Sequence, residues 1–128
     1  MKPEFSSILQ CFGLFKLYLY KNVNMQFISV SELQVNLQQN NVIVLDVREY
    51  YEYEICNIAS FNIPMGEIER RINEIPNDKN VVVLCKSGKR AEVVVNLLEK
   101  EFKFNNLSIL SGGILAWIEN IDNTLELY

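Results

Sequence analysis

Three short runs of apolar residues constrain the fold of this chain more than any other feature. They span residues 42–46, 81–84 and 107–110, and the first two are rich in β-branched side chains. Continuous apolar runs of this length are typical of strands that are buried on both faces of a parallel sheet. Residues 61–64 predict one more short strand, which Pro64 ends.

Segments with helical spacing of apolar residues lie between these runs, at 49–55, 66–75, 89–102 and 113–119. Ser29 and Glu32 have the spacing of a capping box, which predicts a helix from there to about residue 39. Strands that alternate with helices predict a three-layer α/β/α fold with a mainly parallel central sheet. In such sheets, ligands bind at the carboxyl ends of the strands.

The length and composition predict one domain. A chain of 128 residues with 49% hydrophobic content can build one modest core. We place this domain at residues 25–128 and interpret residues 1–24 as an N-terminal extension outside it. The apolar stretch in that extension is interrupted by Gln10 and Lys16, and it is shorter than the roughly 20 residues that cross a bilayer. We therefore expect no membrane span, and a peripheral membrane anchor is the alternative role for these residues.

Charge and residue content exclude several classes of function. The net charge of −4 argues against binding to nucleic acid. The three cysteines, without a secretory pattern, indicate reduced thiols in a cytoplasmic protein. Because the chain has no histidine, zinc sites with histidine ligands and Cys/His dyads are excluded. We expect neither a bound metal nor a cofactor.

The strongest chemical signal is Cys85, which directly follows the run 81–84 and directly precedes a helical pattern. Loop N–H groups and the positive end of the helix dipole point at a group in this position, and nearby cations add positive potential. A nucleophilic thiolate is therefore favoured at Cys85. The alternative is a buried structural cysteine, which is a common fate of a free thiol.

The residues after Cys85 are the candidate substrate-binding residues. Gly88 permits backbone angles and close approaches that a Cβ would prevent. Ser87 offers a hydroxyl, and Arg90 can hold the shape of the loop by binding carbonyls or a carboxylate. The two lysines attract an anionic donor or an acidic partner, with a solvated surface role as their alternative. The candidates from this loop are Lys86, Ser87, Gly88, Lys89 and Arg90, and Arg48 completes the candidate substrate-binding set.

Several motifs resemble the rhodanese family over about residues 26–128. They are Leu45-Asp46-Val47-Arg48-Glu49, the segment 52–58, Asn62-Ile63-Pro64, the loop 85–90 and Gly112-Gly113-Ile114-Leu115-Ala116-Trp117. Within the family, the chain is most similar to the C-terminal rhodanese domain of enzymes that activate ubiquitin-like sulfur carriers for molybdopterin and thiamine synthesis. The adenylating domain that precedes this module in those enzymes is missing from this sequence.

The resemblance implies a rhodanese-like fold and a sulfurtransferase. Cys85 would take sulfane sulfur from thiosulfate or a protein persulfide, hold it as a persulfide, and pass it to a thiophilic acceptor or a sulfur-carrier protein. The implied partners are a ubiquitin-like sulfur carrier and an adenylating enzyme. The alternative is a binding or regulatory module that uses the rhodanese fold without turnover, and the intact loop favours the enzyme.

Loop length distinguishes this chain from a competing enzyme class. The related phosphatases place five residues between cysteine and arginine, whereas four residues separate Cys85 from Arg90 here. The shorter loop leaves less room for a tetrahedral phosphate, and it lacks an obvious general acid. We therefore favour sulfur transfer over phosphatase or arsenate reductase activity.

Four further residues have two interpretations each. Asp46 is expected to be scaffold beside the site, while Arg48 is a candidate for either substrate binding or scaffold. Cys56 is expected to be a small buried residue, with a resolving thiol as the alternative. Trp117 is expected to belong to the core and not to form a stacking platform.

Overall fold

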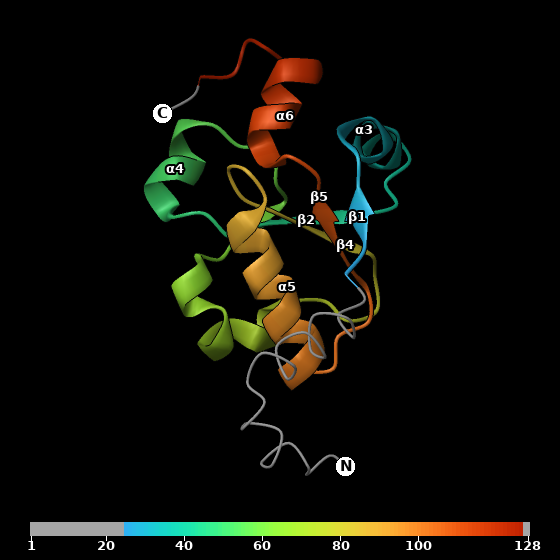
Figure 1. Ribbon diagram of the computed structural model, residues 1–128, viewed down its shortest axis with the longest axis vertical. Coiled ribbons are helices and arrows are strands. Elements are labelled where there is room, and N and C mark those ends of the chain that lie inside the picture. Colours follow the sequence, from blue (N-terminus) through green and yellow to red (C-terminus); the bar gives the residue numbers. More distant parts are fainter. Residues whose placement is uncertain (1–24, 127–128) are drawn as a thin grey trace, which may run out of the picture.

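The computed structural model describes residues 25–126, so the predicted extension at residues 1–24 lies outside the described residues (Figure 1). The elements in chain order are β1 (Phe27–Ile28), α3 (Val30–Gln38), β2 (Ile43–Asp46), α4 (Tyr50–Ile55), β3 (Phe61–Asn62), the 3₁₀ turns η2 (Met65–Glu67) and η3 (Glu69–Glu74), β4 (Val81–Leu84), α5 (Lys89–Glu101), β5 (Leu107–Leu110) and α6 (Gly113–Asn120). Within the described residues, no helix combines the length and the apolar character that crossing a membrane requires.

The strands form one five-stranded sheet in the order β1-β5-β4-β2-β3. Every strand pair in the described part of the chain is parallel. The strand β4 lies at the centre, with β2 on one side and β5 on the other. Asp46 is in register with Leu84, so β2 and β4 end at the same edge of the sheet. This edge is where the sequence predicts the site.

Two apolar clusters cover the two faces of the sheet. Alternate residues of β4 divide between them: Val81 and Val83 join one cluster, and Val82 and Leu84 join the other. The first cluster includes the apolar face of α5, and the second includes residues of α3 and α6. Figure 1 shows α5 on one side of the sheet and α3 with α6 on the other. The predicted three-layer α/β/α fold with a parallel sheet is therefore confirmed.

Helix starts follow the local signals in the sequence. The Ser29 side chain accepts a hydrogen bond from the Glu32 N–H, and the Glu32 carboxylate accepts one from the Ser29 N–H. This reciprocal pair is the predicted capping box, and α3 begins immediately after it. The helix α6 begins at the predicted Gly113, and Trp117 on its apolar face is buried in the core as expected.

Two segments differ from the prediction. The strand β1 was not predicted, because two residues are too short for an apolar pattern. The segment 66–75 was predicted as one helix, but it forms the 3₁₀ turns η2 and η3 with non-helical angles at Arg71. The N–H groups of Ile68, Arg71 and Ile75 each bond to the carbonyl three residues earlier, which is the hydrogen-bond pattern of 3₁₀ turns.

Candidate active site

Cys85 lies at the carboxyl end of the central strand β4, on the short loop that leads into α5. The loop turns at Gly88, whose φ of +113° lies in the left-handed region, and α5 begins at the next residue. The neighbouring strand β2 ends at the same edge of the sheet, so the segment that follows β2 lies near the loop. The structure therefore places Cys85 where open parallel sheets bind ligands.

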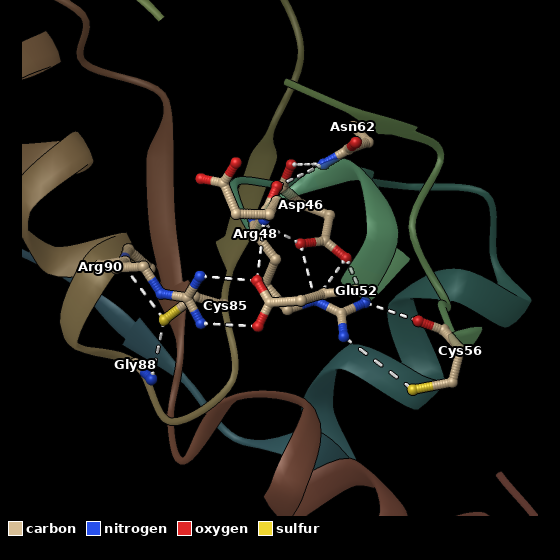
Figure 2. Close-up of polar contacts among 10 residues, drawn as sticks. Asp46, Arg48, Glu52, Cys56, Asn62, Cys85, Gly88 and Arg90 are labelled. Atoms are coloured by element: carbon tan, nitrogen blue, oxygen red, sulfur yellow. Dashed lines mark hydrogen bonds and ion pairs between the residues drawn. The ribbon is translucent and has the colours of Figure 1, made fainter. Parts of the chain in front are cut away.

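The sulfur of Cys85 is held by backbone donors. Its Sγ accepts hydrogen bonds from the Gly88 N–H at 3.0 Å and the Ala91 N–H at 3.4 Å (Figure 2). These N–H groups belong to the first turn of α5, where backbone donors have no partner within the helix. Cys85 is only 1% exposed, so these donors act with little competition from water. The arrangement stabilises negative charge on sulfur at this position.

The N-terminus of α6 supports the loop from the other side. The Ile114 N–H donates to the Cys85 carbonyl at 2.9 Å, and the Leu115 N–H donates to the Lys86 carbonyl at 3.1 Å. In a trans peptide the N–H points opposite to the carbonyl, so these bonds turn the next two loop N–H groups away from α6. Gly113 permits the contact, because a Cβ there would lie 2.3 Å from the Lys86 carbonyl oxygen.

Arg90 binds a carboxylate, which is one of the roles that the sequence predicts for this side chain. Its Nη1 lies 2.8 Å from Glu52 Oε1, and its Nη2 lies 3.3 Å from Glu52 Oε2. Figure 2 shows the two side chains pointing toward each other, from the start of α5 and from α4. Glu52 is 4% exposed, and its carboxylate also accepts the Glu49 N–H at 2.8 Å. This ion pair connects the loop to the segment that follows β2.

Glu52 is the residue that sequence reasoning missed. Glu49 and Glu52 have capping-box spacing at the start of a predicted helix, and the Glu49 N–H donates to the Glu52 carboxylate as in that motif. This spacing was the available signal. It marks a carboxylate that is held at a helix start, but it does not reveal an arginine 38 residues later as the partner.

Arg48 lies in a separate buried network. Its guanidinium is fully buried and binds the Asp46 carboxylate, with Nη2 at 2.6 Å from Oδ2 and Nε at 3.0 Å from both oxygens. Nη2 also donates to the Cys56 carbonyl at 2.6 Å. Asn62 donates from Nδ2 to the carbonyls of Asp46 and Arg48. Asp46 is thus part of the scaffold, and a substrate that contacted Arg48 would have to displace these partners.

The other candidates occupy distinct environments. Ser87 and Lys89 are exposed, Lys86 is half-buried, and Gly88 is buried. Cys56 is buried as expected, but it belongs to the cluster on the α6 face, whereas Cys85 belongs to the cluster on the α5 face. A disulfide between these two thiols would therefore require rearrangement of the core.

The comparisons with known proteins agree with this geometry. The family model of the rhodanese-like domain matches residues 29–120. The chain is 32% identical over 111 residues to adenylyltransferase and sulfurtransferase MOCS3-1 of Drosophila pseudoobscura pseudoobscura, which covers 80% of this chain and 25% of the relative. It is 29% identical over 97 residues to adenylyltransferase and sulfurtransferase UBA4 of Saccharomyces cerevisiae (strain YJM789), which covers 67% of this chain and 22% of that protein.

A solved structure shows the same fold in a chain of similar length. The rhodanese-related protein from Thermoplasma volcanium superimposes with a TM-score of 0.68 at 33% identity, over 75% of this chain and 93% of that one. By contrast, the chain spans about a quarter of the length of the curated relatives that it matches. The family match extends over both apolar clusters and the loop that carries Cys85. The chain therefore belongs to the rhodanese-like domain family.

Proposed function

We propose that this protein is a sulfurtransferase that carries sulfane sulfur as a persulfide on Cys85. The observation that carries the proposal is the pair of N–H groups, from Gly88 and Ala91, that converge on the buried Sγ. Such donors stabilise negative charge on the sulfur, and a persulfide anion needs donors of the same kind around its outer sulfur. The relatives are named as sulfurtransferases as well as adenylyltransferases, which supports the same assignment.

Loading of the sulfur is a displacement at a sulfane sulfur atom. The Cys85 thiolate attacks the outer sulfur of a persulfide R–S–SH, the donor S–S bond breaks, and its electron pair leaves with RS⁻ to give Cys85–S–SH. With thiosulfate, the thiolate attacks the terminal sulfur, and the products are Cys85–S–S⁻ and sulfite. Charge and atoms balance in both cases, and neither step requires an external oxidant or reductant.

Unloading transfers the outer sulfur of the persulfide from Cys85 to an acceptor. An acceptor thiolate attacks the outer sulfur of the Cys85 persulfide, the persulfide bond breaks, and the Cys85 thiolate is regenerated. The exposed Ser87 and Lys89 and the half-buried Lys86 lie on the loop that an incoming donor or acceptor must approach. We assign these three residues to substrate contact and Arg90 to loop shape. In this proposal Arg48 acts as scaffold.

The proposed partners follow from the curated relatives, whose names combine adenylyl transfer with sulfur transfer. The partner classes that these names suggest are an acceptor of the sulfur-carrier type and an adenylating enzyme. A cytoplasmic location is part of the proposal, because Cys85 must remain reduced between turnovers.

Intact-protein mass spectrometry tests the proposal. Wild type is incubated with thiosulfate, or separately with glutathione persulfide, and then with cyanide. We expect a gain of one sulfur atom, its loss to cyanide as thiocyanate, and peptide mapping of the adduct to Cys85. Cys85→Ala should not load, whereas Cys56→Ala, the matched control at the other described thiol, should load normally. If neither donor produced an adduct, the result would contradict the proposal that the protein carries a persulfide and would favour a non-catalytic binding module.

A further inference from the structure

Glu52 places a negative charge beside a loop that otherwise attracts anions. Its carboxylate is nearly completely buried and contacts Arg90, the last residue of the loop, through both oxygens. The carboxylate is held by the Glu49 N–H and by its position on α4, so it cannot turn away into solvent. Figure 2 shows Glu52 directed toward the loop side of the site.

This ion pair changes which anions the loop can hold. A guanidinium that follows a cysteine loop is well suited to bind an oxyanion through two N–H groups, but here two such N–H groups already bind a carboxylate. An incoming dianion would meet the repulsion of Glu52 at short range, where a protein interior screens charge weakly. The Lys89 ammonium is exposed, so its attraction is screened by water and salt.

A persulfide sulfur carries at most one charge, and we expect different donors to bind it. These donors are the Gly88 and Ala91 N–H groups, which form hydrogen bonds to the sulfur of Cys85. These donors are neutral dipoles, so they gain less from the second charge of an oxyanion than a guanidinium cation does. The site therefore discriminates by charge, and the discriminating group is Glu52.

From this geometry we propose that Glu52 is a specificity-determining residue that acts through Arg90 and weakens the binding of dianionic oxyanions, thiosulfate included, relative to persulfide donors. The inference rests on the proposed function, because it assigns a donor class to the same loop. It names the persulfide of a thiol as the preferred donor and thiosulfate as a poor one.

The substitution Glu52→Gln isolates the charge. Glutamine has nearly the same shape, and its carbonyl oxygen can accept the bonds that Glu52 Oε1 accepts from the Glu49 N–H and Arg90 Nη1, while the longer Nη2–Oε2 contact is lost. Glu32→Gln is the matched control, since Glu32 is the capping-box glutamate of α3 and its carboxylate bonds to the Ser29 N–H. Both substitutions remove one carboxylate from a capping box, but only Glu52 touches the loop.

The affinity for an unreactive dianion is the direct readout. Sulfate is titrated at constant ionic strength into ¹⁵N-labelled full-length protein, and the shifts of the Gly88 and Ala91 amide signals give its dissociation constant. We expect Glu52→Gln to bind sulfate roughly tenfold more tightly than wild type, the scale of one added charge repulsion at the loop. Glu32→Gln should bind sulfate as wild type does. The double variant Glu52→Gln/Arg90→Gln should lose the gain, because the gain depends on the guanidinium.

Kinetics supply the second readout. In Glu52→Gln, the KM for thiosulfate should fall by a larger factor than the KM for the persulfide of 2-mercaptoethanol, which carries at most one charge, so the ratio of the two KM values should change. Equal sulfate affinity in Glu52→Gln and wild type would overturn the proposal, as would a gain that persists in the double variant. The sulfate titration needs no turnover, so it tests the role of Glu52 independently of the proposed function. The absence of any Cys85 adduct would contradict the proposed function itself. The dispersion of the amide spectrum shows whether each variant is folded.

Discussion

At the residue scale, Gly88 serves the site through its backbone alone. Its N–H donates to Cys85 Sγ at 3.0 Å, and its φ of +113° turns the chain into α5. A Cβ there would meet no atom closer than 3.9 Å, so the obstacle to substitution is the backbone conformation and not crowding. Residues with a Cβ rarely adopt such angles, and forcing them to do so costs about 1–3 kcal/mol.

We therefore expect Gly88→Ala to lower the free energy of unfolding by about 1–3 kcal/mol and to reduce sulfur loading of Cys85. Urea unfolding followed by circular dichroism measures the first effect, and mass spectrometry measures the second. Gly66→Ala is the control, because Gly66 has no atom within 4 Å of the added Cβ and its φ is not positive. Equal destabilisation in both variants would contradict the backbone argument.

The buried pair of Arg48 and Asp46 supports a second prediction. Both side chains are fully buried, and Arg48→Met would leave the Asp46 carboxylate without its guanidinium. Removing one member of such a pair costs about 3–5 kcal/mol, because the other charge stays buried and uncompensated. Arg70→Met removes the arginine of an ion pair in which that side chain is 71% exposed, so we expect a loss of about 0–1 kcal/mol there.

Urea unfolding of the two variants checks this comparison. If Arg48→Met kept wild-type stability and raised only the KM for the donor, Arg48 would be a substrate contact and the scaffold assignment would be wrong. The double variant Asp46→Leu/Arg48→Met should recover part of the lost stability, since no buried charge then remains without a partner.

Single residues also show what the sequence could reveal about the site. Cys85 and its loop were predictable, because a strand, a cysteine, a glycine and a helix follow one another directly in the chain. Glu52 was not predictable as the partner of Arg90, because that contact depends on how α4 and α5 pack. The burial of Arg48 was equally hidden, since its motif fits a scaffold and a substrate contact alike.

At the element scale, α6 holds the active-site loop in place. Its first N–H groups bind the carbonyls of Cys85 and Lys86, and this close approach is possible only because Gly113 has no side chain. An added Cβ would lie 2.5 Å or less from both carbonyl oxygens, and these are backbone atoms that cannot move as a flexible side chain does. The loop and the helix would therefore have to separate.

We expect Gly113→Ala to lower the free energy of unfolding by at least about 2 kcal/mol and to abolish sulfur loading more completely than Gly88→Ala does. Unfolding in urea and the mass shift of Cys85 are the measurements. The amide signals of Gly88 and Ala91 should also move in this variant. Unchanged signals together with normal loading would show that α6 does not shape the loop.

Apolar periodicity predicted the elements with uneven success, for physical reasons. The pattern of Ile68, Ile72 and Ile75 correctly indicated the side of the segment that packs on the core. It could not reveal the 3₁₀ hydrogen bonds, because residues three apart lie on nearly the same side of both a 3₁₀ turn and an α-helix. The strand β1 depends on pairing with β5, in register Phe27 with Ile109, and its two residues carry no pattern of their own.

At the scale of the whole molecule, alternation along the central strands divides the core between the two faces of the sheet. The continuous apolar runs predicted this burial on both faces, and the helix spacing predicted the three layers. The same patterns do not predict the strand order β1-β5-β4-β2-β3, because this order depends on pairings between segments far apart in the chain. The partners of β4, for example, come from both sides of it in the sequence.

The rhodanese-like family match covers residues 29–120, which supports a prediction about domain organisation. A protein of residues 25–128 should fold, load sulfur on Cys85 and unfold in urea at the midpoint of the full chain. Trp117, the single tryptophan, reports the cluster on the α6 face, while circular dichroism reports the whole fold. Because one domain unfolds as a unit, the two signals should change together. A lower midpoint in the shorter protein would show that residues 1–24 contribute to the core, and separate transitions would contradict a single cooperative domain.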